Sequence, residues 1–135
     1  MWKVERDIAA LGGLATTAEL LARDHDAELL RILSRSGRIR RVRKGRYALA
    51  DTPEPILRAW AAGGRLACLS ALAYFEGRPI GEDPLHVGFP RSFRGVRAGT
   101  HVIAHWSKRD PGGDRVAVSL QTASEQAARC THKST

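Results

Sequence analysis

The chain has 135 residues, enough for one ordinary domain or two very small ones. Its 43% of hydrophobic residues can form a core, which excludes wholesale disorder, and its formal net charge of +8 favours a polyanionic partner. No apolar run approaches the roughly 20 residues that span a bilayer. The acids Glu5 and Asp7 interrupt the apolar N-terminus and exclude a signal peptide. We therefore expect a cytoplasmic protein with no membrane partner and with two reduced thiols.

Capping residues, apolar spacing and glycine stops predict the helices and strands. Thr16 followed by Glu19 has the spacing of a capping box, and Asp24 or Asp26 can cap the helix that buries Leu30 and Leu33. The predicted helices cover residues 2–11, 16 to about 24, about 26–36, 56–62, 70–76 and 122–129. The predicted strands of the second half cover residues 85–89, 100–106 and 115–118, and a linker or turn with two prolines covers 51–55.

The stretch 31–49 contains the strongest functional signal. Eight of the 22 basic residues lie in 31–46, and no acid occurs in 30–49. Apolar residues at 39, 42, 47 and 49 are interleaved with the charges, as in a β-ribbon that is anchored on a core. The Lys44-Gly45 pair between two strand-like runs suits a hairpin turn whose glycine takes a positive φ. Two short helices followed by a basic ribbon predict an α+β fold, with a winged helix-turn-helix at residues 1–50 and a small mixed α/β domain at 55–130.

The sequence resembles the AbiEi-type antitoxins of type IV toxin–antitoxin systems. The similar segments are 12–20, the basic ribbon with its Gly-x-Tyr at 37–49, and the later pieces 69–73, 77–79, 85–90 and 118–123. The resemblance implies a winged-helix domain that binds operator repeats and represses its own operon. It also implies a second domain that serves the neutralisation of a nucleotidyltransferase toxin. Some relatives have the same N-terminal region before a Vsr-like endonuclease domain.

The candidate DNA-binding residues fall into three groups. Ribbon residues Arg38, Arg40, Arg41, Arg43, Lys44 and Arg46 suit phosphate and minor-groove contacts, with about half of them on one face. The two helices predicted at 16 to about 24 and about 26–36, with the turn between them, supply candidates for contact with phosphates or bases: Thr16, Thr17, His25, Arg31 and Arg35. A second cluster, Arg91, Arg94 and Arg97, surrounds Phe93. The alternative for each group is structural: a solvated basic surface, or threonines that only cap a helix.

Other residue types predict core rather than chemistry. We expect Cys68 and the aromatic residues Trp60, Tyr74, Phe75 and Trp106 to be core. His86, His101 and His105 invite a metal site, but no cysteine or carboxylate is seen to complete a set, so we predict no metal and no cofactor. We also predict no enzymatic activity, because Ser70 lacks a Gly-x-Ser-x-Gly context and no P-loop or acid-x-Lys pair is present.

These observations favour a sequence-specific transcriptional repressor that binds a double-stranded DNA operator as a monomer or homodimer. Three alternatives stay open. The protein could be an antitoxin that neutralises a toxin by direct binding, a prophage or mobile-element repressor unconnected with a toxin, or a truncated nuclease relative with metal-dependent cleavage.

Overall fold

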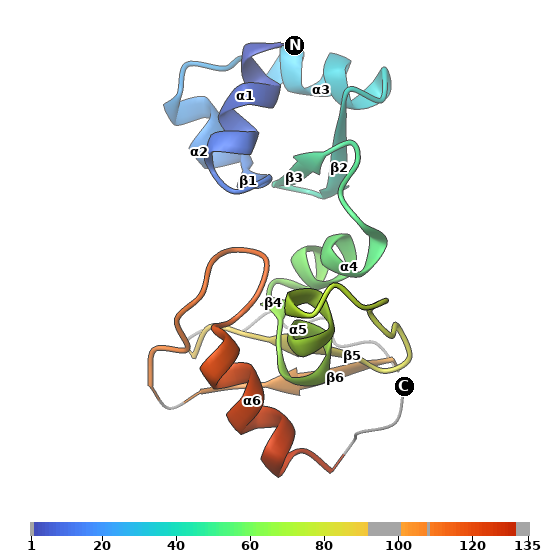
Figure 1. Cartoon of the computed structure of the whole chain (residues 1–135). Coiled ribbons are helices and arrows are strands. Elements are labelled where there is room, and N and C mark those ends of the chain that lie inside the picture. Colours follow the sequence, from blue (N-terminus) through green and yellow to red (C-terminus); the bar gives the residue numbers. More distant parts are fainter. Residues whose placement is uncertain (1, 92–100, 108, 132–135) are drawn as a thin grey trace. The chain divides into compact units, whose positions relative to one another are not determined.

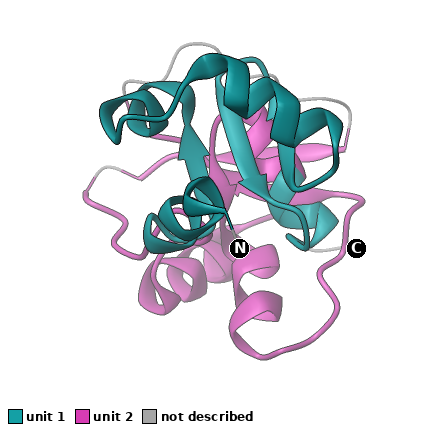
Figure 2. Ribbon diagram, turned by 90° about the horizontal axis from the view of Figure 1, so that it is seen from above, with its two compact units in different colours: residues 1–57 teal, residues 58–135 magenta. Residues whose placement is uncertain are grey.

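The computed structural model describes residues 2–91, 101–107 and 109–131. Within these residues the chain is α+β, with six helices and two three-stranded sheets (Figure 1). It divides into two compact units, unit 1 (Met1–Leu57) and unit 2 (Arg58–Thr135), which Figure 2 shows in separate colours. The division lies inside helix α4 (Glu54–Ala62), which begins two residues before the predicted start because Pro55 is compatible with a first helical turn. No helix in the described part of the chain has the length and apolar character needed to cross a membrane.

Unit 1 contains three helices and one antiparallel sheet. Its elements are α1 (Lys3–Ala10), β1 (Leu14–Thr16), α2 (Thr17–Ala22), α3 (Ala27–Arg35), β2 (Ile39–Arg43) and β3 (Arg46–Leu49). The sheet order is β1-β3-β2, and the helices lie on one side of it (Figure 1). The three predicted helices and the hairpin are confirmed. Strand β1 was not predicted, because its three residues overlap the capping sequence of α2.

Local capping explains where α2 and α3 begin. The Thr16 hydroxyl accepts the Glu19 backbone N–H at 3.2 Å, while the Glu19 carboxylate accepts the Thr16 N–H at 2.9 Å, which forms the predicted capping box. The Asp26 carboxylate accepts the Glu28 N–H at 3.0 Å and caps α3. These bonds satisfy backbone donors that the helices themselves leave unpaired.

The core of unit 1 joins the helices to the sheet. Its buried members are Val4, Ile8, Ala15, Leu20, Leu30, Leu33, Ile39 and Tyr47. Leu30 and Leu33 face inward, as the helical spacing predicted. Fully burying each large aliphatic side chain stabilises the fold by about 1.5–3 kcal/mol. The basic hairpin is therefore fixed to the helices through Ile39 and Tyr47.

Unit 2 combines a small sheet with two packed helices. Its remaining elements are β4 (Arg65–Leu66), α5 (Cys68–Phe75), β5 (Leu85–Gly88), β6 (Val102–His105) and α6 (Leu120–Arg129). Strand β5 pairs antiparallel with β4 and parallel with β6. Helix α5 packs against both α6 and β5. It begins at Cys68, two residues before the predicted start.

The predicted strands at 85–89 and 100–106 are confirmed over residues 85–88 and 102–105, and residue 100 lies outside the described residues. The strand predicted at 115–118 is confirmed only in part. Only Ala117 forms an isolated bridge there, to Leu66. The Asp114 carboxylate accepts the backbone N–H groups of Val116, at 2.8 Å, and Ala117, at 3.1 Å. These local bonds form a turn and divert two backbone donors, so pairing with Leu66 is limited to the Val118 N–H, which donates to the Leu66 carbonyl oxygen at 2.9 Å, and the Val116 carbonyl oxygen, which accepts the Leu66 N–H at 2.8 Å.

Several side chains predicted to be core lie at the surface. Trp60 is buried, but the exposed fractions are 51% for Trp106, 45% for Phe75 and 37% for Tyr74. Tyr74 and Phe75 are the last two residues of α5 and lie beyond its buried face. Trp106 follows β6, and the centroid of its ring lies 5.7 Å from that of the Phe89 ring. Along α6 the buried residues are Ala123 and Gln126. Cys68 is fully buried, as predicted.

Candidate functional site

The β2–β3 hairpin is held at its tip as well as at its base. Gly45 has a φ of +83°, as predicted for the second residue of the turn. Its carbonyl oxygen accepts the backbone N–H of Thr17 at 3.0 Å. Since Thr17 begins α2, this bond fixes the turn beside the helical pair. The hairpin is thus attached to α2 at its turn and to the core through Ile39 and Tyr47.

Burial divides the hairpin cations into two classes. The exposed ones are Arg38, Arg40, Arg41 and Lys44, whereas Arg43 and Arg46 are half-buried and face each other across the strands. Burial lowers the pKa of Arg46, and the adjacent positive charge of Arg43 lowers it further. The ladder changes register between residues 41 and 43, so the predicted simple alternation of faces does not hold.

Helix α3 adds a second exposed surface. Arg31 and Arg35 both lie on its outward side, and Arg31 forms an ion pair with Glu28 at 2.6 Å. Between them Ile32 exposes 51% of its surface. The sequence carries no separate signal for Ile32, although helical spacing places it outside the Leu30 and Leu33 face. An exposed aliphatic side chain on such a helix can contact a thymine methyl group.

The remaining candidates of the helical pair have structural partners. His25 is 8% exposed, and its Nε2 lies 2.6 Å from Asp7 Oδ2. The hydrogen bond from His25 lowers the pKa of the Asp7 carboxyl, and the charge of Arg23 adds to that effect. This contact ties α1 to the α2–α3 turn, so we assign His25 a structural role. Thr16 caps α2, and the backbone of Thr17 holds the hairpin turn.

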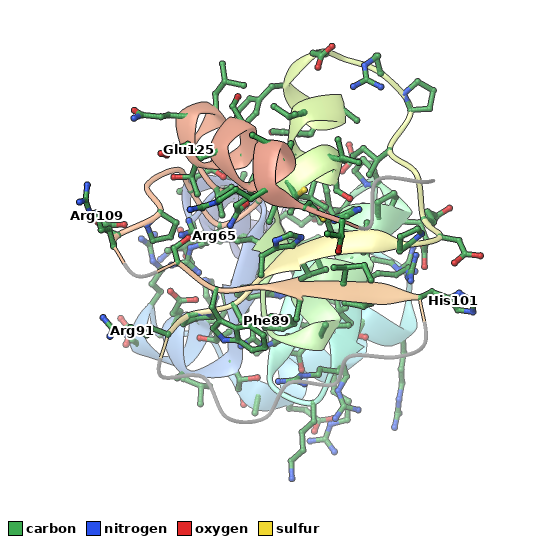
Figure 3. The ribbon with its side chains drawn as sticks, turned by 90° about the horizontal axis from the view of Figure 1, so that it is seen from below. Arg65, Phe89, Arg91, His101, Arg109 and Glu125 are labelled. Atoms are coloured by element: carbon green, nitrogen blue, oxygen red, sulfur yellow. The ribbon has the colours of Figure 1, made fainter. Side chains whose placement is uncertain are left out.

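The second predicted basic cluster is described only at its first residue. Arg91 is exposed and points away from unit 2 (Figure 3). Arg94 and Arg97, together with Phe93, lie outside the described residues. The cluster therefore remains a prediction from sequence.

Unit 2 brings two cysteines and two histidines together. One side-chain atom each from Cys68, His86, His105 and Cys130 lies within 4.8 Å of the other three. The prediction that no cysteine would complete a histidine set is therefore wrong. His101 is not a member: it lies just before β6, its Nδ1 is 2.7 Å from Asp83 Oδ1, and its ring points outward (Figure 3).

A groove of about 950 Å³ adjoins this cysteine–histidine cluster. His105 and Cys130 line it, together with Gln126 and the two residues Arg109 and Glu125 labelled in Figure 3. The pKa of Arg65, on the neighbouring strand β4, is lowered by burial. Within the cluster, Cys68 and His86 are fully buried, whereas His105 and Cys130 are half-buried and line the groove, so the cluster has a closed side in the core and an open side on the groove.

Comparison with known proteins adds no family assignment. No family model matches the chain, and no curated protein matches it.

Proposed function

We propose that this protein is a sequence-specific DNA-binding transcriptional repressor, with unit 1 acting as a winged helix-turn-helix. In this proposal the β2–β3 hairpin is the wing and α3 is the recognition helix. The observation that carries it is the set of exposed cations on a hairpin that is anchored to both the core and α2. The resemblance of residues 12–20 and 37–49 to AbiEi-type antitoxins supports the same function and favours autoregulation.

The distribution of charge suggests how each element would contribute. Asp26 and Glu28 occupy the start of α3, whereas Arg31 and Arg35 lie on its later turns. Phosphate oxygens would therefore be met by the second half of α3 and by the hairpin. Arginine suits this role because its planar guanidinium can bind phosphate through two hydrogen bonds. Base recognition would rest on α3, where Ile32 and Arg35 lie on the exposed side.

The test is a fluorescence-anisotropy titration of the full chain at physiological salt. One duplex comes from the DNA upstream of the protein's own gene, and the other is a random duplex of equal length. We expect upstream DNA to bind at least about 1,000-fold more tightly than random DNA, the low end of specificity ratios for such proteins. The Arg40→Ala/Arg41→Ala variant should lose most of the affinity for both duplexes.

Two controls make the result decisive. A Lys3→Ala/Arg6→Ala variant removes the same charge from α1 and should bind nearly as wild type. Circular dichroism checks that each variant is folded. Equal, weak binding of both duplexes by the wild-type chain would contradict a sequence-specific repressor. Residues 55–130 would then be searched for a protein partner, as the antitoxin alternative requires.

A further inference from the structure

We propose that Cys68, His86, His105 and Cys130 bind one Zn²⁺ ion that holds unit 2 together. The four residues come from four separate places: the first residue of α5, strand β5, the last residue of β6 and the residue that follows α6. Thiolate and imidazole are the ligand types that zinc takes in structural protein sites, and two of each is a common set.

The distances fit a tetrahedral site. Zinc bonds of about 2.0–2.1 Å to nitrogen and 2.3 Å to sulfur, at tetrahedral angles, separate two nitrogens by about 3.3 Å and a nitrogen from a sulfur by about 3.6 Å. His86 Nδ1 lies 3.0 Å from His105 Nε2, and Cys130 Sγ lies 3.9 Å from His86 Nδ1. Since all four ligand atoms lie within 4.8 Å of one another, small side-chain movements suffice to complete the coordination.

Neighbouring residues position the ligands. The Cys68 backbone N–H donates to Gln126 Oε1 at 3.0 Å, which joins the start of α5 to α6. Cys68 has a φ of +51°, a left-handed conformation that is costly for a residue with a side chain. The His86 backbone N–H donates to Ser70 Oγ at 2.9 Å. These bonds fix the backbone at the two fully buried ligands.

The charge of the four ligands also favours zinc binding. Binding requires both imidazoles to present a lone pair and both thiols to lose their protons, so two protons are released for each ion. The two thiolates then cancel the +2 charge of the metal, and the buried site is neutral overall. Four protein ligands would leave no open position, which identifies a structural site and not a catalytic one. The ion would connect the end of α6 to the β5–β6 pair and to α5.

The alternative is a metal-free cluster of packed thiols, with one hydrogen bond between the two imidazoles. A second alternative is a disulfide between Cys68 and Cys130. Both alternatives predict a folded chain that contains no zinc, so metal content and thiol state distinguish them from the proposal.

The experiment uses the untagged full chain, because an affinity tag rich in histidine would itself bind metal. Metal content is measured by mass spectrometry after dialysis, and we expect about one zinc per chain. Replacing zinc by Co²⁺ should give the intense visible bands of a tetrahedral cobalt–thiolate site. Thiol titration should find both cysteines protected with zinc present and reactive after chelation.

The test variant is Cys130→Ser, chosen because Cys130 is only half-buried and its replacement disturbs the core least. Its zinc affinity should fall by more than about 100-fold, beyond the usual effect of changes outside the ligand shell. The matched control is His101→Ala, which removes a histidine next to β6 that is outside the cluster. It should keep wild-type affinity.

A second variant, Cys130→His, covers failure of the serine variant to fold. It replaces one zinc ligand by another and should retain zinc and the tetrahedral cobalt spectrum with weaker thiolate absorption. A folded wild-type chain without zinc, or one in which the cysteines form a disulfide, would overturn the proposal. So would Cys130→Ser binding zinc as tightly as wild type.

Discussion

Replacing Arg40 and Arg41 by alanine should change the salt dependence of DNA binding by a calculable amount. Both side chains are exposed on the hairpin and neither contributes to the core of unit 1. Arg40 has only a long 4.0 Å ion pair, to the exposed Glu54. The double variant therefore removes two charges with little expected effect on folding, since isolated surface ion pairs contribute about 0–1 kcal/mol.

The magnitude follows from the number of exposed cations. If each of Arg38, Arg40, Arg41 and Lys44 neutralises one phosphate, the hairpin contributes about −3.6 to the slope of log K against log salt, in addition to the contribution of α3. Raising salt from about 50 to 200 mM then weakens the hairpin's share of wild-type binding about 150-fold. The double variant retains two hairpin contacts, so this contribution falls to about −1.8, or about 12-fold over the same change of salt.

The assay is anisotropy at four or more salt concentrations on one duplex, fitted for the slope. The Lys3→Ala/Arg6→Ala variant serves as the charge-matched control and should keep the wild-type slope. If the two double variants show equal slopes, the hairpin makes no special contact and the attraction comes from net charge alone. That result would refute the assignment of the hairpin as the DNA-contacting element.

Four further outcomes are expected. Asp7→Asn should lower the free energy of unfolding of unit 1 at pH 7, measured by urea unfolding. Because folding lowers the pKa of Asp7, the difference in stability between wild type and variant should persist at pH values above the ordinary aspartate pKa of about 3.9 and vanish as the pH falls through the lowered pKa. Leu30→Ala should cost about 2–5 kcal/mol in the same assay, since Leu30 is fully buried. Gly45→Ala should cost about 1–2 kcal/mol of stability through its positive φ alone, because a Cβ there meets no neighbour. Gly64→Ala should cost about 3 kcal/mol, because its Cβ would overlap the Gly88 carbonyl oxygen. Urea unfolding of both variants compares the two losses. Removal of zinc by a chelator should lower the melting temperature of unit 2 and leave that of unit 1 unchanged. Where free zinc is about 1,000 times its Kd, the stabilisation that unit 2 loses is about 4 kcal/mol. Calorimetry with and without chelator measures the two melting temperatures.

The elements of unit 1 were predictable because their signals are local. Thr16 with Glu19, Asp26 before α3 and Gly45 in the turn each act within a few residues of their own position. The apolar spacing of α3 also placed Leu30 correctly. Such signals do not depend on the rest of the fold, so sequence alone could locate the helices and the hairpin.

Signals in unit 2 depend on tertiary contacts and were harder to interpret. The apolar run that ends in α5 looked like core throughout, yet Phe75, the last residue of α5, is exposed. The cysteine–histidine cluster shows the same limit more strongly. Cys68 and Cys130 are separated by most of unit 2, and the packing of α5 on α6 and the parallel pairing of β5 with β6 bring their side chains to the two histidines. No spacing motif in the sequence encodes that arrangement.

If the protein is the proposed repressor, exposure more than charge determines which cations of the hairpin can reach DNA. From sequence, Arg41 and Arg43 are equivalent, because both belong to one basic run. In the folded chain the register shift between them leaves Arg41 exposed and Arg43 half-buried opposite Arg46. A half-buried guanidinium must leave its packing to reach a phosphate, whereas an exposed one only exchanges water for phosphate. A variant that removes Arg43 would therefore mix a loss of packing with a loss of contact, and Arg40 and Arg41 are the residues whose removal reports on DNA binding alone.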